Sequence, residues 1–242
     1  MKTILVTGSN GGIGSAIAAR MKQIGFFVIG IDNSPDKNNL DEFISSDLND
    51  LVLNEKNVEQ LTSTINELSK SHNFYALVNN AAIQILGDIK SIKINDFQKT
   101  LNINVVAPFI LSKILYKQLQ NNTGSIVNIG SVHSKLSKPG FLVYSTSKSA
   151  LKGMSNAMSL EMGDKVRVNS IHPAAVNTQM LKDGLTDEGF LNLQNFHPTR
   201  SISSPEEVAI CVEFLINNRL QFLNGSNIEL DGGISSRLHD PQ

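Results

Sequence analysis

The stretch Lys2-Thr3-Ile4-Leu5-Val6-Thr7-Gly8-Ser9-Asn10-Gly11-Gly12-Ile13-Gly14 decides the fold that this sequence predicts. Lys2 to Thr7 is a short β-forming run, and Ser15 to Ile24 after the glycines has a helical pattern. A strand, a glycine-rich loop and a helix in this order are the context of a dinucleotide-binding fingerprint. Glycines let the backbone approach a pyrophosphate closely, and the helix N-terminus offers it free N–H groups. A tight turn without a ligand is the alternative for a lone glycine cluster.

The next predicted strand, Phe26 to Ile31, ends in Asp32. Asp32 follows Gly14 by about 18 residues, close to the spacing of about 20 expected for an acid that binds ribose hydroxyls. A carboxylate accepts hydrogen bonds from both hydroxyls of a free ribose, whereas it repels a 2′-phosphate. Lys37 is the nearest cation downstream, beyond Pro35. The sequence therefore predicts that NAD(H) is preferred over NADP(H).

Strands and helices are predicted to alternate along the rest of the chain. The predicted strands are Phe43-Ile44, Phe74 to Val78 and Ser125 to Ile129, and the predicted helices are Asn54 to Ser69, Asp96 to Leu119 and Tyr144 to Met162. This alternation predicts an α/β fold, a doubly wound parallel sheet (Rossmann fold) in three layers with right-handed crossovers. Because no linker or internal repeat interrupts the pattern, residues 1–242 are expected to form a single domain.

Pro108 lies inside the predicted helix from Asp96 to Leu119. A proline has no N–H for the carbonyl four residues earlier, and its ring crowds that carbonyl. The residue four positions back is Asn104. The sequence therefore predicts a bent helix and a freed Asn104 carbonyl that could hold a water molecule.

Ser131, Tyr144 and Lys148 are suited to chemistry on a carbonyl oxygen. Ser131 follows the predicted strand Ser125 to Ile129, at the edge where open α/β sheets bind ligands. Lys148 lies one helical turn after Tyr144, so their side chains share a face of the predicted helix. A neighbouring cation lowers the pKa of a tyrosine from its ordinary value of about 10. The three side chains together can hold a carbonyl oxygen and move a proton. The alternative for Tyr144 and Lys148 is an exposed helical pair.

Taken together, these motifs resemble the short-chain dehydrogenase/reductase family in its single-domain branch. The resemblance extends over nearly the whole chain, with the motifs in the family's order. The matching segments are Thr7-Gly8-x-x-x-Gly12-x-Gly14 for the cofactor loop, Asn79-Asn80-Ala81-Ala82 for Asn-Asn-Ala-Gly, Pro173-Ala174-Ala175-Val176-Asn177-Thr178 for Pro-Gly-x-Val-x-Thr, and Asp231-Gly232-Gly233 near the C-terminus. The residues that match the family's catalytic tetrad are Asn104, Ser131, Tyr144 and Lys148.

The resemblance implies an NAD-dependent oxidoreductase that transfers a hydride between the nicotinamide and an alcohol or carbonyl substrate, such as a secondary alcohol, sugar or steroid. Tyr144 would be the acid and base, with its pKa lowered by Lys148, which would also hold the nicotinamide ribose. Ser131 would orient the substrate oxygen, and Asn104 would keep a water that connects Lys148 to solvent. The residues implied at the cofactor are Gly8, Ser9, Asn10, Gly12, Ile13, Gly14, Asp32, Asp47, Leu48, Asn80, Ala81, Ala82, Tyr144, Lys148, Pro173, Val176 and Thr178. It also implies a homo-oligomer, a tetramer or dimer, joined through helices near 96–119 and 144–162.

Composition argues against several other classes of protein. The net charge is −1 and no basic block is present, which argues against nucleic acid and membrane surfaces as partners. One cysteine, Cys211, cannot make a disulfide framework, and no apolar run approaches a membrane span. A cytoplasmic protein is expected. The histidines have no metal-ligand spacing, so no metal site is predicted; they are His72, His133, His172, His197 and His239.

The sequence does not identify the substrate. Gln179 to Arg200 has no strong periodicity and is expected to form a mobile lid over the substrate. The side chains that would line the pocket are Met180, Leu181, Leu185, Phe190 and Leu193 on the lid, with Gln84, His133 and Phe141; an ordinary surface loop is the alternative for each.

Other readings of the chain are less well supported. The longer family branch that acts on nucleotide sugars needs a C-terminal domain for which too few residues follow Thr178. Enoyl reductases of the family space their tyrosine and lysine more widely than Tyr144 and Lys148. A non-catalytic NAD-binding regulator is the alternative from another class, and a broken tetrad would mark it.

Overall fold

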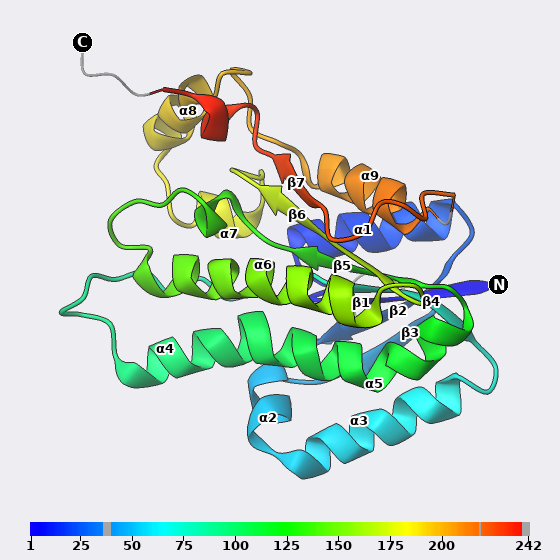
Figure 1. Cartoon of the computed structure of the whole chain (residues 1–242). Helices are drawn as coiled ribbons and strands as arrows, with labels where there is room; N and C mark the ends of the chain where they lie inside the picture. The colour runs from blue at the N-terminus through cyan, green and yellow to red at the C-terminus, as the bar shows by residue number, and fades with distance from the viewer. Residues whose placement is uncertain (36–39, 218, 239–242) are drawn as a thin grey trace.

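The structure, a computed structural model, describes residues 1–35, 40–217 and 219–238 (Figure 1). Lys37 and His239 lie outside the described residues. Seven strands form one sheet in the order β3-β2-β1-β4-β5-β6-β7. The strands are β1 (Lys2–Thr7), β2 (Phe27–Asp32), β3 (Glu42–Ser45), β4 (Asn73–Asn79), β5 (Ser125–Ile129), β6 (Arg167–Pro173) and β7 (Asn227–Leu230).

Every strand pairs in parallel with its neighbours, so the predicted doubly wound sheet is confirmed. The strand order reverses between β1 and β4. In open α/β sheets ligands bind at this reversal, beyond the carboxyl ends of the strands. The glycine loop after β1 and Asn80 after β4 therefore lie at the position where the fold provides a crevice.

Helices cover both faces of the sheet (Figure 1). The helices are α1 (Gly12–Gln23), α2 (Leu48–Leu53), α3 (Glu55–Leu68), α4 (Ile94–Leu101), α5 (Ala107–Asn121), α6 (Leu142–Met162), α7 (Gln179–Lys182), α8 (Asp187–Phe196) and α9 (Pro205–Ile216). In Figure 1, α1 and α9 lie above the sheet, and α3, α5 and α6 lie below it. No described helix is long and apolar enough to cross a bilayer.

Each central strand contributes side chains to two separate hydrophobic cores. Ile4 and Val6 of β1 pack into the core that includes Ile17 of α1 and Val212 of α9. Leu5, on the opposite face of the same strand, packs into the core of α3, α5 and α6. Both faces of a central strand are thus buried, which explains the uninterrupted apolar residues Ile4-Leu5-Val6 in β1.

The predicted helix from Asp96 to Leu119 is not one helix. The π-helical segment Asn102–Val106 separates α4 from α5, and Pro108 stands in the first turn of α5. Because Pro108 has no N–H to give to Asn104, the α-helical hydrogen-bond pattern cannot continue across this point. The chain adopts a wider π turn at this point, where the sequence had predicted one bent helix.

Two helical segments were not predicted. α2 begins after Asp47, whose carboxylate accepts hydrogen bonds from the backbone N–H groups of Asn49 and Asp50. The segment 179–200, expected to be irregular, contains α7 and α8. Thr186 caps α8 and acidic residues fill its first turn, so the helix-start signal was present in the sequence.

Candidate active site

The glycine loop takes a conformation that side chains would block. Gly8 has φ 64°, a left-handed conformation that favours glycine. A Cβ on Gly14 would come within 2.0 Å of the Gly8 carbonyl oxygen. α1 begins at Gly12 after the N-cap Gly11, which has no side chain to cap the helix. No side chain therefore caps the N–H groups of the first turn, which leaves room for an anion at this helix start.

The end of β4 is hydrogen-bonded to this loop. The Thr7 hydroxyl accepts hydrogen bonds from the backbone N–H groups of Asn80 and Ala81, both at 3.0 Å. The Asn80 side chain donates to the carbonyls of Thr7, at 2.9 Å, and Gly8, at 3.1 Å. Thr7 was quoted in the family motif, but no role had been assigned to its hydroxyl. Its position as the last residue of β1 is the signal that could have indicated this role.

Asp32, the last residue of β2, lies beside the same loop. Its carboxylate accepts hydrogen bonds from the Asn10 N–H at 3.0 Å and from the N–H and hydroxyl of Ser34. The Asn10 side chain donates to the Ser34 carbonyl and hydroxyl and to the Pro35 carbonyl. Ser46, after β3, donates its N–H to the Asp32 carbonyl and thereby brings Asp47 to the same edge.

The segment after β6 reaches the glycine loop from the other side. A Cβ on Gly12 would lie 3.0 Å from the Thr178 Cγ2, so Gly12 and Thr178 are in close contact. Among described residues other than glycine, only Thr123 and Arg200 have a positive φ. Ala82 and Ala174 therefore occupy backbone conformations that accept a Cβ, although alanine replaces the family's glycine at both positions.

Ser131 and Tyr144 meet beyond the end of β5. Ser131 is only 6% exposed and its hydroxyl accepts a hydrogen bond from the His133 N–H at 3.2 Å. Tyr144 lies in the first turn of α6. Burial raises the pKa of Tyr144, and a hydrogen bond with the Ser131 side chain partly offsets that rise. The net direction is opposite to the lowering expected from Lys148, because burial of the phenol is the larger effect.

Lys148 is buried one turn further along α6 and is only 2% exposed. Its Nζ donates to the Ile129 carbonyl at 2.8 Å and lies 5.7 Å from the centre of the Tyr144 ring. Burial lowers the pKa of Lys148 to about 8. The ammonium is therefore easier to deprotonate than an ordinary lysine, which suits a group that passes protons near neutrality.

Asn104 is held by its side chain within the π-helical segment. Its Oδ1 accepts from the Ile83 N–H, and its Nδ2 donates to the Ile83 carbonyl, both at 2.9 Å. The same Nδ2 donates to the Ser147 hydroxyl at 3.0 Å, and that hydroxyl donates to the Tyr144 carbonyl at 2.7 Å. Ser147, which sequence reasoning had missed, thus connects Asn104 to the helix turn that carries Tyr144.

An aromatic cluster adjoins Tyr144. The His133 ring stacks on Phe141 with 4.2 Å between centroids and an angle of 5°, and it meets the Tyr144 ring edge-on at 5.8 Å. Burial, with the nearby charge of Lys138, lowers the pKa of His133 to about 4. His133 is therefore neutral near pH 7. Of the predicted pocket residues, the structure brings His133 and Phe141 to Tyr144.

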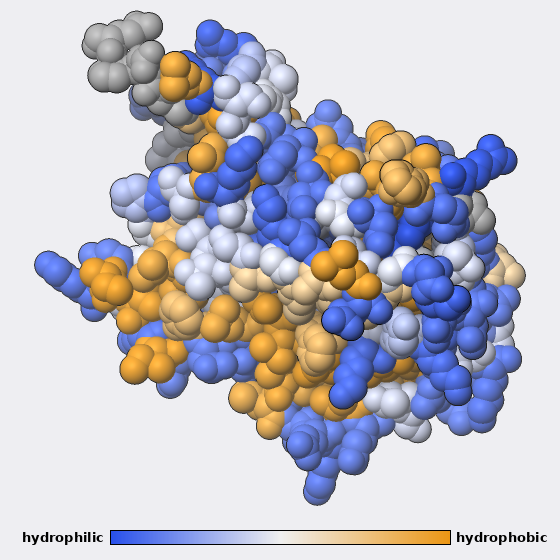
Figure 2. Space-filling model, in the orientation of Figure 1, coloured by the Kyte–Doolittle hydropathy of each residue, from blue (hydrophilic) through white to orange (hydrophobic). Residues whose placement is uncertain are grey.

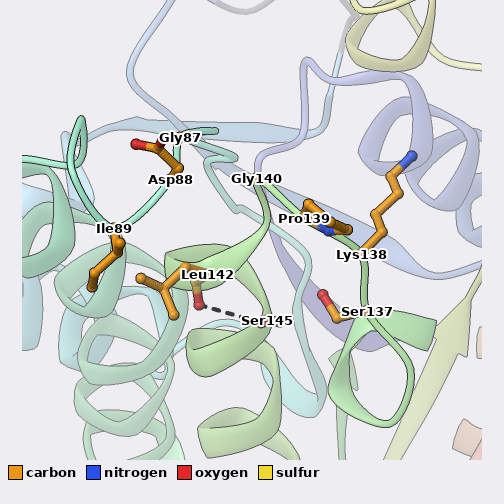
Figure 3. A pocket seen from close by; sticks show the side chains of 9 residues that line it. All are labelled: Gly87, Asp88, Ile89, Ser137, Lys138, Pro139, Gly140, Leu142 and Ser145. Carbon is orange, nitrogen blue, oxygen red and sulfur yellow. Dashed lines mark hydrogen bonds between the residues drawn. The ribbon is translucent and has the colours of Figure 1, made fainter.

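An open depression adjoins the start of α6 (Figure 3). It has a volume of about 540 Å³ and lies between Gly87–Ile89 and the segment from Ser137 to Ser145. A hydrogen bond from the Gly87 N–H to the Gly140 carbonyl joins its two walls. Leu142 and Ser145 flank Tyr144 in sequence and line this depression, but none of the four tetrad side chains does. The depression is thus distinct from the tetrad region.

Known proteins resemble this chain over most of its length. A family model described as enoyl-(acyl carrier protein) reductase matches residues 8–235. The 3-oxoacyl-(acyl-carrier-protein) reductase FabG of Rickettsia prowazekii (strain Madrid E) is 32% identical over 236 residues, which cover 96% of this chain and 96% of that protein. The similarity therefore includes the glycine loop, the tetrad positions and the C-terminal strand.

Solved structures share the same fold. The ligand-free aldohexose dehydrogenase of Thermoplasma acidophilum superposes with a TM-score of 0.90 at 28% identity, covering 100% of this chain and 97% of that one. A 4-hydroxyisoleucine dehydrogenase complexed with NADH gives 0.89 at 27% identity and covers 98% and 100%. ElxO with NADP bound gives 0.87 at 26% identity and covers 98% and 99%. Nicotinamide cofactors of both kinds thus occur among proteins of this fold.

We expect the replacement Lys148→Met to remove a pH dependence of stability. The unfolded chain keeps a lysine proton up to about pH 10.4, whereas folded Lys148 releases it near pH 8. Between these values the unfolded state binds more protons, so the free energy of unfolding rises with pH by up to about 1.4 kcal/mol per unit. Urea unfolding at pH values from about 8 to about 10 measures this slope. Above that range Tyr144 would contribute a slope of opposite sign, because its phenol ionises at lower pH in the unfolded chain than in the folded one.

Lys113→Met, at an exposed position of α5, is the matched control and should keep the wild-type slope. Equal slopes in wild type and Lys148→Met would show that the buried lysine does not titrate in this range.

Proposed function

Because this chain belongs to the short-chain dehydrogenase/reductase family, we propose that it is an NAD-dependent oxidoreductase that interconverts an alcohol and a carbonyl compound. A bound nicotinamide cofactor would supply or accept the hydride. The observation that carries the proposal is the buried Lys148 ammonium, which lies 5.7 Å from the centre of the Tyr144 ring and donates to the carbonyl of Ile129, the last residue of β5. Ser131 follows the same strand, and Asn104 is linked to the Tyr144 carbonyl through the Ser147 hydroxyl.

Tyr144 is the proposed proton donor and acceptor. Burial raises the pKa of its phenol, so Tyr144 is protonated at neutral pH and ready to donate to a carbonyl oxygen. Ser131 holds the same oxygen with its hydroxyl. Lys148, with its pKa lowered to about 8, returns a proton to Tyr144 after each turnover of carbonyl reduction. In alcohol oxidation the same groups move the proton in the opposite direction.

The crevice fits a dinucleotide. Gly8, Gly12 and Gly14 carry no Cβ at loop positions where one would meet neighbouring atoms at about 3 Å or less, and α1 begins without a side-chain cap, which suits a pyrophosphate. The residues proposed to hold the cofactor are Gly8, Ser9, Asn10, Gly12, Ile13, Gly14, Asp32, Asp47, Leu48, Asn80, Ala81, Ala82, Tyr144, Lys148, Pro173, Val176 and Thr178. Asn104 is proposed to keep a water beside Lys148 through its main-chain carbonyl.

Asp32 supports NAD(H) as the preferred cofactor. Its carboxylate, Asn10 and Ser34 form one hydrogen-bonded group beside the glycine loop, where the adenine ribose of a bound cofactor would lie. The bonds that hold Asp32 come from a backbone N–H and from Ser34 and not from a cationic side chain, so these partners would not offset the repulsion between the carboxylate and a 2′-phosphate.

The substrate class is an alcohol or a carbonyl compound. The relatives' names point to different substrates, among them 3-oxoacyl groups, aldohexoses and 4-hydroxyisoleucine. We propose that the lid 179–200, with His133, Gln84 and Phe141, sets the choice. The activity is tested by incubating the protein and NAD with a panel of secondary alcohols, sugars and hydroxysteroids and measuring NADH formation. A protein that binds NADH but turns over no member would instead support the non-catalytic regulator.

Tyr144→Phe should reduce hydride transfer by at least about 100-fold, because only the phenol oxygen that moves the proton is lost. NADH binding, followed by fluorescence, should stay at the wild-type level. Tyr116→Phe, on α5, is the matched control and should leave kcat unchanged. A Tyr144→Phe variant that keeps most of its kcat would contradict the assignment of Tyr144.

Wild-type enzyme should prefer NAD over NADP in kcat/KM by about tenfold to a thousandfold. Two unit charges about 4 Å apart repel by roughly 1–4 kcal/mol at effective dielectric constants of about 80 to 20. Asp32→Ala should remove most of this preference, and Asp32→Asn separates loss of charge from loss of hydrogen bonding. Equal efficiency with both cofactors, or an Asp32→Ala variant that still excludes NADP, would show that Asp32 does not set the choice.

We also propose a homo-oligomer, a tetramer or a dimer. Figure 2 shows apolar side chains gathered over α4, α5 and α6. Exposed apolar side chains on these helices include Ile94 at 87%, Phe109 at 49% and Leu160 at 83%. Sedimentation velocity at micromolar concentration should give a species larger than a monomer, and Leu160→Lys should shift it toward the monomer. A wild-type monomer would contradict the proposal.

A further inference from the structure

His172 is a buried histidine that the proposed chemistry does not use. It is the penultimate residue of β6, and it is fully buried. Nδ1 lies 2.9 Å from the Ser134 hydroxyl and 3.2 Å from the Ser131 carbonyl oxygen. Nε2 lies 2.8 Å from the Ser170 hydroxyl and 3.2 Å from the Asn227 Oδ1. The ring therefore bridges the segment that carries Ser131 to the strands β6 and β7.

Gly130 makes room for this ring immediately before Ser131. A Cβ on Gly130 would lie 2.5 Å from the His172 Nδ1 and 2.6 Å from its Cε1. The Gly130 N–H also donates to the Ile171 carbonyl at 2.7 Å. The imidazole thus packs directly against the backbone from which the Ser131 side chain extends.

The hydrogen-bond partners decide which ring nitrogen carries the proton. Nε2 faces the Asn227 Oδ1, which can only accept, and the Ser170 hydroxyl, which donates to that same Oδ1, so we assign the proton to Nε2, and Nδ1 accepts from the Ser134 hydroxyl. Burial lowers the pKa of His172 and favours the neutral ring. Of the charged groups around it, Glu229 on β7 favours protonation and Lys152 on α6 opposes it.

We propose that His172 is a positioning residue for Ser131. Nδ1 accepts from the Ser134 hydroxyl at 2.9 Å and fixes Ser134, whose N–H donates to the Ser131 carbonyl at 2.9 Å. The Ser134 carbonyl accepts from the Ser149 hydroxyl, next to Lys148 on α6. The segment from Ser131 to Ser134 is thus fixed between β6 and α6, so His172 determines the position of the Ser131 hydroxyl, which interacts with Tyr144. This inference rests on the proposed function of Ser131.

A pair of amide substitutions separates this role from ordinary core packing. The amide oxygen of asparagine can lie about where the histidine Nδ1 lies, whereas the amide of glutamine reaches toward the Nε2 position. His172→Asn can still accept from the Ser134 hydroxyl and should keep kcat within a few-fold. His172→Gln should lower kcat roughly ten- to hundredfold, the scale for a catalytic group displaced by about 1 Å. The affinity for NADH should be unchanged in both.

The pH profile of alcohol oxidation gives a readout that packing alone would not move. The hydrogen bond from Ser131 lowers the pKa of Tyr144. Loss of this hydrogen bond should raise that pKa, so kcat for alcohol oxidation, which increases as Tyr144 loses its proton, should increase only at higher pH. His172→Gln should show the same displacement as Ser131→Ala and add nothing to it in the double variant. Equal kcat losses in the Asn and Gln variants, or additive losses with Ser131→Ala, would overturn the inference.

Amide hydrogen exchange of residues 130–136 tests the inference without any activity. Exchange of this segment should become faster in His172→Gln and should stay at the wild-type rate in His172→Asn. Unchanged exchange in His172→Gln would overturn the positioning role. A wild-type protein that turns over no substrate would contradict the proposed function, while the exchange result would still decide whether His172 fixes the segment.

Discussion

The hydrogen bonds between the end of β1 and the end of β4 hold the two halves of the site together. The Thr7 hydroxyl and the Asn80 side chain tie the glycine loop to the strand on the other side of the topological reversal. The Thr7 hydroxyl accepts from the N–H groups of Asn80 and Ala81, and the chain continues to Ile83, whose N–H donates to the Asn104 side chain. Asn104 donates to the Ser147 hydroxyl, which donates to the Tyr144 carbonyl. The cofactor crevice and the proposed proton donor thus belong to one connected polar framework inside a largely apolar molecule.

Burial sets the charge state of that framework. Tyr144 and Lys148 both experience a lower dielectric than water, which raises the pKa of the phenol and lowers that of the ammonium. The two pKa values nearly coincide in solution, and the shifts move them apart, with the pKa of Lys148 now the lower of the two. Lys148 therefore gives up its proton more readily than Tyr144, which favours proton transfer from the lysine to the phenolate, and this follows from desolvation before any direct contact between the two groups.

Local sequence signals predicted most of the sheet and the polar ends of its strands. Gly8, Asp32 and Ser131 could be placed because each follows a recognisable β run, and parallel strands bring their carboxyl ends to one edge. The π-helical segment could not be predicted in this way, since its register depends on Asn104 reaching Ile83 and Ser147. No positioning role could be predicted for His172, because its partners Ser134 and Asn227 are remote in sequence.

The π-helical segment Asn102–Val106 also constrains the length of the chain. A π turn contains one residue more than the α-helical turn it replaces, so deleting one residue there would bring α4 and α5 into α-helical register, with the hydrogen bond from position 108 still missing. Each residue of an α-helix turns the chain by about 100°. The amide of Asn104 would then rotate away from Ile83 and Ser147, although hydrophobic packing of α5 could be preserved. This segment should therefore tolerate many changes of side chain but no change in the number of residues.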